Sequence, residues 1–220
     1  MIKAIIFDFD GVLVESVDIK TKAFSELFSD YGPGIVEKII QHHLAHGGIS
    51  RYEKIKFYYR EYLNVPLSPE ELNKLCQEFS ALVLQKVIHA PFVSGAMEFL
   101  KNNSQKYNLF IVSGTPHEEM VHITQAKGMH MYFMDIFGSP TVKGTHIQNI
   151  LLDHGLKGKE VVFVGDSITD YRAARTTSVN FLGRVAPRDN NPFTGDVITI
   201  PDLNDLNNCI KHILKKDVIV

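Results

Sequence analysis

The 220-residue chain lacks the features that would assign it to an oxidising compartment, a membrane or a nucleic-acid partner. Its only cysteines, Cys76 and Cys209, lie far apart and outside any Cys-x-x-Cys pattern, which favours free thiols in a reducing compartment. A formal net charge of −2 gives no basic surface for nucleic acid. No apolar run reaches about 18 residues, and no charged-then-apolar leader precedes the first apolar segment. We therefore expect a cytoplasmic protein with neither nucleic acid nor a membrane among its partners.

What the chain does contain, with 45% hydrophobic residues, is a series of short apolar runs separated by helical patterns. The runs suited to buried strands cover residues 2–7, 109–112, 161–164, 180–182 and 197–200, with a shorter one at 136–137. Between two of them, Thr-Pro-His-Glu at 115–118 resembles a capping box and predicts a helix start. Alternating strands and helices predict an α/β fold with a parallel sheet and right-handed crossovers.

Residues 17–90 interrupt this alternation. Apolar residues recur there at helical spacing, Ser68-Pro69-Glu70-Glu71 is a strong helix start, and no strand pattern intervenes. We therefore predict a helical domain at 17–90 inserted into an α/β core formed by residues 1–16 and 91–220.

Two aspartates directly follow the first apolar run. Asp8 and Asp10 alternate with Phe9, so on a strand both carboxylates leave the same face. Like charges this close repel and raise each other's pKa unless a cation lies between them. Gly11 then permits a sharp turn of the backbone. The pattern indicates a metal site, a reactive carboxylate, or both.

Polar residues also follow the later strands, at the edge where ligands bind in such sheets. Mg²⁺ prefers carboxylate oxygens, so Asp8 and Asp166 suit it, with Asp170 as a further ligand or a holder of its water. A carboxylate can also attack phosphorus, and Asp10 could then protonate the leaving oxygen and activate water. The residues for a divalent metal and a reacting phosphoryl group are therefore present.

Three more positions fit the phosphoryl oxygens. Ser113 could donate its hydroxyl, and Gly114 and Thr115 could donate their backbone N–H groups at the predicted helix start. Lys143 could supply a point charge where negative charge spreads in the transition state.

Four segments resemble motifs one to four of the haloacid dehalogenase (HAD) superfamily, in order: DFDGVLVES at 8–16, VSGT at 112–115, Lys143, and GDSITD at 165–170. The resemblance implies a Rossmann-like parallel sheet core and identifies the helical insertion with a C1 cap, similar to phosphoglycolate phosphatases and β-phosphoglucomutases. It also implies the roles of the site residues: a nucleophile at Asp8, a general acid/base at Asp10 whose backbone carbonyl binds the metal, phosphate binding at Ser113 and Lys143, and metal binding at Asp166 and Asp170.

Departures from the family pattern narrow the function. Dehalogenases lack the second aspartate, so Asp10 favours phosphoryl transfer. The segment HGGISRYEK at 46–54 resembles the cap specificity loop of β-phosphoglucomutases, but those mutases carry a histidine where this chain has Lys20. Arg51 and Lys54 in that segment could meet an acidic group of a substrate. Phosphonoacetaldehyde hydrolases carry a Schiff-base lysine in the cap; Lys20, Lys22 and Lys54 are the candidates here, and the sequence alone does not show that any of them is buried enough for the lowered pKa that this role needs.

The sequence thus predicts a Mg²⁺-dependent phosphatase of a small phosphorylated metabolite, acting through an aspartyl-phosphate. A β-phosphoglucomutase-like phosphomutase and a non-catalytic phosphometabolite-binding protein on the same scaffold remain alternatives. Oligomeric state, the identity of the ester, and the choice between Mg²⁺ and Mn²⁺ stay open, since an all-oxygen ligand set suits both metals.

Overall fold

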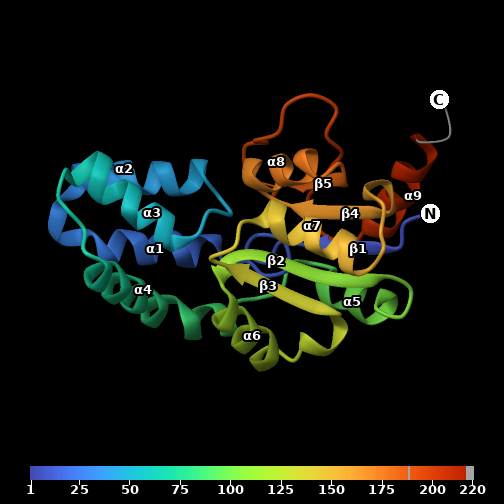
Figure 1. Ribbon diagram of the computed structural model, residues 1–220, viewed down its shortest axis with the longest axis horizontal. Helices are drawn as coiled ribbons and strands as arrows, with labels where there is room; N and C mark the ends of the chain where they lie inside the picture. The colour runs from blue at the N-terminus through green and yellow to red at the C-terminus, as the bar shows by residue number, and fades with distance from the viewer. Residues whose placement is uncertain (188, 217–220) are drawn as a thin grey trace.

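The computed structural model describes residues 1–187 and 189–216, and its centre is a parallel six-stranded sheet (Figure 1). The strand order is β3-β2-β1-β4-β5-β6, so the N-terminal strand lies in the middle. The strands are β1 (Ala4–Phe7), β2 (Asn108–Pro116), β3 (Asp135–Ser139), β4 (Val161–Gly165), β5 (Asn180–Arg184) and β6 (Thr199–Ile200). Strand β6 is thus shorter than the run predicted at 197–200, and β2 is longer than the run predicted at 109–112.

Both faces of the sheet are covered by helices because successive side chains of a strand point to opposite faces. Ile5 and Phe7 of β1 belong to the larger apolar cluster, with α5 (Ala96–Asn103), α6 (His117–Ala126) and α9 (Leu206–Lys216). Ala4 and Ile6 belong to the smaller cluster, with α7 (Lys143–Asp153) and α8 (Ile168–Thr176). Short 3₁₀ turns lie at Ser29–Tyr31, His130–Tyr132 and Gly158–Glu160.

The segment from 17 to 90 is helical and lies beside the carboxyl edge of the sheet (Figure 1). It contains α1 (Val17–Leu27), α2 (Pro33–Ala45), α3 (Arg51–Tyr58), a π-helical turn at Tyr59–Leu63, and α4 (Pro69–His89). Phe24, Phe28, Tyr58 and Phe79 pack as its aromatic centre. We call residues 17–90 the cap and the rest of the described chain the core, a boundary that remains a prediction.

Helix starts in the cap follow the sequence, whereas one in the core does not. The Ser68 hydroxyl accepts a hydrogen bond from the Glu71 N–H at the start of α4, as the sequence predicts. The capping box predicted at Thr115 is wrong, because β2 continues through Thr115 and α6 begins at His117 without a side-chain cap. The predicted fold class, an α/β parallel-sheet core with an inserted helical segment, is confirmed. In the residues described, no helix combines the length and apolar character that a membrane span needs.

Candidate active site

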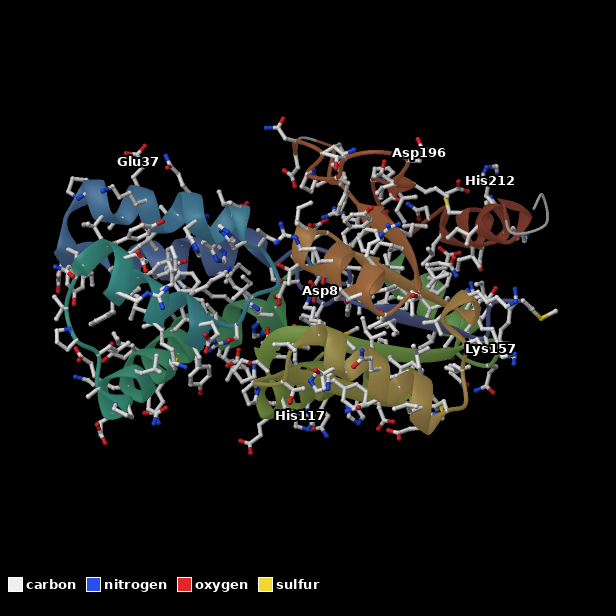
Figure 2. All side chains as sticks on the ribbon, turned by 45° about the horizontal axis from the view of Figure 1, so that its top comes forward. Asp8, Glu37, His117, Lys157, Asp196 and His212 are labelled. Carbon is white, nitrogen blue, oxygen red and sulfur yellow. The ribbon has the colours of Figure 1, made fainter. Side chains whose placement is uncertain are left out.

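The site lies where the middle strand ends and the cap meets the core. Figure 2 places Asp8 at that junction, between the cap helices and the sheet. The Asp8 N–H continues the ladder by donating to the Val164 carbonyl at 2.9 Å. The chain then turns at Gly11, whose φ is +74° and whose added Cβ would lie 2.1 Å from Asp166 Oδ2. Only glycine allows the backbone to turn this close to the Asp166 carboxylate.

Three carboxylates gather at this end of the sheet. Asp8, Asp166 and Asp170 each offer an oxygen, and these oxygens all lie within 4.8 Å of one another. Lys143 Nζ lies 2.9 Å from Asp8 Oδ2 and 2.6 Å from Asp170 Oδ1. The single ammonium group therefore faces three carboxylates, and the cluster keeps an excess of negative charge.

The pKa values reflect this excess. Burial, with added repulsion from Asp170 and Asp10, raises the pKa of Asp8 to about 7 even though Lys143 opposes the rise. Burial and the neighbouring carboxylates, Asp8 first among them, raise the pKa of Asp166 well above its usual range. Burial disfavours the charge on Lys143, but Asp170 and Asp8 outweigh it and hold the pKa above its ordinary value. The cluster would be more stable with a further cation.

Asp170 has little capacity left for a direct metal bond. Its Oδ1 accepts from Lys143, and its Oδ2 accepts from the Ser167 N–H at 3.1 Å and from the Ser167 hydroxyl at 2.6 Å. It is also fully buried at the first turn of α8, in a reciprocal cap with Ser167. This geometry orients Lys143. Each Asp8 oxygen accepts one bond, Oδ1 from the Phe9 N–H at 2.7 Å and Oδ2 from Lys143, and Asp166 accepts none among the described residues, so these two carboxylates have more capacity for a metal than Asp170.

The Asp10 side chain belongs to a separate network. Its Oδ1 accepts from the Ser16 hydroxyl at 2.6 Å, and its Oδ2 accepts from Lys20 Nζ and from the Thr115 hydroxyl. Lys20 Nζ also donates to Thr115 Oγ1 at 2.6 Å. Burial alone would raise the pKa of Asp10, but Lys20 and the hydroxyl donors lower it below the usual value. This role of Lys20 was not predicted from the sequence. The available signal was its place in the predicted helical insertion, ten residues after Asp10.

The predicted phosphate-binding turn lies at the end of β2. Ser113 is 1% exposed and its hydroxyl accepts the Thr115 N–H at 3.1 Å, so that N–H already has a partner. A Cβ on Gly114 would lie 2.5 Å from the carbonyl oxygen of Gly48 in the cap. The cap loop therefore touches the core at Gly114, and a side chain at that position would push the two apart.

A cavity of about 840 Å³ lies between the core and the cap. We call the core residues that line it the core wall and the cap residues that line it the cap wall. Core residues on its lining include Asp8, Asp10 and Asp166, and cap residues include Gly48, Arg51 and Lys54. A volume of this size suits a small-molecule ligand.

The two cations predicted to read the substrate differ in their surroundings. Arg51 is 5% exposed, and its Nη2 lies 2.6 Å from Glu119 Oε1 on core helix α6. Its other amino group donates to Ser80, and its guanidinium lies 4.7 Å from the centre of the Phe79 ring. Lys54 is 2% exposed, and among the described residues its hydrogen bonds go to His43 alone. Both line the cavity, but Arg51 already has a carboxylate partner.

Comparison with known proteins agrees with this geometry. The family described as haloacid dehalogenase-like hydrolase matches residues 5–184. A phosphoglycolate phosphatase from Aliivibrio fischeri is 27% identical over 183 residues, 79% of this chain and 80% of that protein. A phosphorylated carbohydrates phosphatase from Thermotoga maritima is 25% identical, over 80% and 82% of the two chains. The crystal structure of a β-phosphoglucomutase from Clostridium difficile superposes over the whole of both chains with a TM-score of 0.80 at 16% identity.

Proposed function

Because the chain belongs to the haloacid dehalogenase-like hydrolases and is a phosphoric monoester hydrolase of that superfamily, we propose that it cleaves a small-molecule phosphate monoester through an aspartyl-phosphate on Asp8, with Mg²⁺. The predictions of family and of enzyme class are confirmed; the metal, the intermediate and the substrate are proposals. The observation that carries them is the meeting of Asp8, Lys143 and Asp166 at one end of a strand, beside a cavity of about 840 Å³.

The residues fit a hard divalent cation. The donors are carboxylate oxygens, which Mg²⁺ prefers, and their raised pKa values indicate negative charge that Lys143 alone does not balance. Asp8 and Asp166 would hold the ion, together with the backbone carbonyl of Asp10 that the family resemblance implies. The bound ion would neutralise the cluster and polarise a phosphoryl oxygen.

The chain's own residues supply the remaining chemistry. Asp8 attacks phosphorus, so that a bond from its carboxylate oxygen forms while the ester P–O bond breaks. Asp10 gives a proton to the departing oxygen, and then takes one from the water that hydrolyses the aspartyl-phosphate. The hydrogen bonds from Lys20 and Ser16 favour the ionised form of Asp10 that takes the proton in the second step, and they make the protonated form a stronger acid for the first step. Lys143, held by Asp170, stabilises the charge on the transferring group.

The cap closes over this chemistry. Its Gly47–Gly48 loop lies against Ser167, Lys143 and Gly114, so the loop covers the phosphoryl site. Exclusion of bulk water during transfer favours the carboxylate as nucleophile, and reopening admits water and releases the product. The two relatives are phosphatases named for phosphoglycolate and for phosphorylated carbohydrates, which supports these two kinds of substrate for this chain.

The first test is phosphate release from a panel of small esters, with Mg²⁺ and with a chelator. We expect release that requires Mg²⁺ and that falls at least about 10⁴-fold in Asp8→Asn, with the circular dichroism spectrum unchanged. An Asp8→Asn protein that still turns over would exclude the aspartyl-phosphate. Isomerised sugar phosphate without free phosphate would favour the phosphomutase, and Mg²⁺-dependent ligand binding without turnover would favour a non-catalytic binding protein.

A further inference from the structure

Lys54 stands apart from the other cations that line the cavity in the part of the chain that the structure describes. Lys20 is paired with Asp10, Arg51 with Glu119 and Arg184 with Glu15. Lys54 has no carboxylate partner, and its ammonium group donates to the ring nitrogen of His43 at 2.8 Å and to the His43 carbonyl at 3.2 Å. The ammonium form of this side chain, which is 2% exposed, thus has no counter-ion beside it.

The groups around Lys54 do not neutralise it. His43 comes from α2, and burial and then Lys54 lower its pKa to about 2, so the ring is neutral and acts as an acceptor. Lys20 and Lys143 add repulsion, which Asp10 and Asp166 across the cavity partly offset. Burial is the largest influence, and together these lower the pKa of Lys54 to about 7. Such a group gains most from an anion that enters the cavity beside it.

We propose that Lys54 binds a carboxylate on the part of the substrate that is not transferred, so that the natural substrate is a phosphorylated carboxylic acid. This inference rests on the proposed function, and it chooses between the two kinds of substrate that the relatives support. A carboxylate matches the single charge of Lys54 and forms a charge-assisted hydrogen bond with it. A neutral hydroxyl in the same place leaves the ammonium group unpaired, so the pocket rejects it.

The position of Lys54 explains how the carboxylate would help catalysis. Lys54 comes from cap helix α3, whereas Asp8 and Lys143 come from the core. A substrate held at both ends joins the cap to the core and favours the closed state in which the Gly47–Gly48 loop covers the site. Arg51 on the same helix does not compete for this role, because Glu119 and Ser80 already occupy its guanidinium.

The experiment uses pairs of esters that differ only in a carboxylate against a CH₂OH group. One pair is 2-phosphoglycolate and 2-hydroxyethyl phosphate, and the longer pair is 6-phosphogluconate and sorbitol 6-phosphate. For each pair we measure the ratio of kcat/KM values, acid over alcohol, with Mg²⁺. We expect the ratio to exceed 1 in the wild type for at least one pair, and to fall about tenfold or more in Lys54→Gln while the alcohol is hydrolysed as before.

Two variants control for the removal of a lysine. Lys54→Arg keeps the charge and should retain most of the preference for the acid. Lys56→Gln removes the same charge from an exposed position on the same helix, where the lysine pairs with Glu53, and should leave the ratio unchanged. A merely structural role for Lys54 would slow both members of a pair equally and would not move the ratio.

The pH profile of the ratio gives an independent readout. Because the pKa of Lys54 is about 7, the amine is charged below that pH and neutral above it. The preference for the acid should therefore fall as the pH rises through 7, and should stay flat in Lys54→Arg. The second ionisation of the phosphate, common to both members of a pair, largely cancels in the ratio.

Each outcome decides the matter. Hydrolysis of the alcohols with no preference for acids, or an unchanged ratio in Lys54→Gln, overturns the carboxylate site and leaves the phosphatase standing. If Lys54→Gln loses activity toward sorbitol 1,6-bisphosphate alone and keeps its activity toward sorbitol 6-phosphate, the site binds a second phosphate, and the proposal is also overturned. Should no ester be hydrolysed, the proposed function fails, and calorimetric titration of the same pairs into Asp8→Asn, with and without Lys54→Gln, still tests the preference through binding.

Discussion

The two walls of the cavity carry opposite unbalanced charges. On the core wall, three carboxylates gather around the one ammonium group of Lys143, and burial raises the pKa of Asp8 to about 7. On the cap wall, Lys54 is buried beside a neutral histidine, and its pKa falls to about 7. A metal ion would complete the core wall and a substrate anion the cap wall. The difference separates the residues that perform the chemistry from those that choose the substrate.

The largest expected effect comes from removing the cation of the core wall. Lys143→Met leaves Asp8 and Asp170 buried without their ammonium partner, which should lower the free energy of unfolding by about 3–5 kcal/mol in a chelator. Added Mg²⁺ should restore part of that loss, since an ion held by the carboxylates replaces the missing charge. Urea unfolding with and without Mg²⁺ measures both quantities.

The matched control is Lys3→Met. Lys3 also pairs with a carboxylate, Glu160, but its side chain is 56% exposed, so solvent screens the pair and its loss should change the free energy of unfolding little. Equal losses in Lys3→Met and Lys143→Met would contradict the view that the core wall depends on a buried, under-compensated ion cluster.

The core wall could be predicted from the sequence, and the physical reason is the parallel sheet. Asp8 and Asp166 each follow a buried apolar run, and parallel strands bring such ends to one edge, so their convergence needs no knowledge of distant contacts. Lys143 is the first residue of α7, the helix that follows β3, and it reaches the same edge of the sheet. Local pattern and topology together determine these positions.

The cap wall could not be predicted in the same way, because its charges are decided by partners distant in sequence. Arg51 and Lys54 look alike in the segment HGGISRYEK, yet Arg51 pairs with Glu119 on a core helix, whereas Lys54 hydrogen-bonds to His43 and has no carboxylate partner among the described residues. The pairing depends on how α3 packs against α4 and how α4 packs against α6, which periodicity does not give. The error at Thr115 has a related cause, because pairing with β3 extends β2 beyond the residues that local signals favour.

The pair between Arg51 and Glu119 offers the next largest effect. Because both side chains are buried and they join the cap to the core, we expect a coupling free energy of about 1–3 kcal/mol in the cycle Arg51→Met, Glu119→Gln and the double variant. Urea unfolding of the four proteins measures it. The ratio of kcat/KM for acid over alcohol should stay as in the wild type in Arg51→Met, because Glu119 and not the substrate occupies the Arg51 guanidinium. A ratio that falls as it does in Lys54→Gln would show that the pair reads the substrate rather than holding the cap.

The smallest expected effect on stability, and the most direct test of how the walls meet, comes from the cap loop. Gly48 has a φ of +77°, and a Cβ there would lie 3.1 Å from Ser167 Oγ and 3.2 Å from Lys143 Nζ. Gly48→Ala should cost about 1 kcal/mol in backbone strain and should also push the closed cap away from the phosphoryl site. We expect kcat/KM to fall severalfold for acid and alcohol alike, since the change acts on closure and not on the Lys54 site.

Gly32 separates strain from contact. It also lies in the cap, has a φ of +83°, and has nothing within 4 Å of an added Cβ. Because its ψ of 162° adds to the strain, Gly32→Ala should cost at least as much stability, measured by urea unfolding, and leave kcat/KM unchanged. Equal losses of activity in both variants would mean that the cap tolerates contact at Gly48, and that the two walls meet less closely during turnover than the Gly48–Gly114 approach indicates. A loss specific to Gly48→Ala would instead establish that turnover needs the close contact between the cap loop and the core that the Gly48–Gly114 approach indicates.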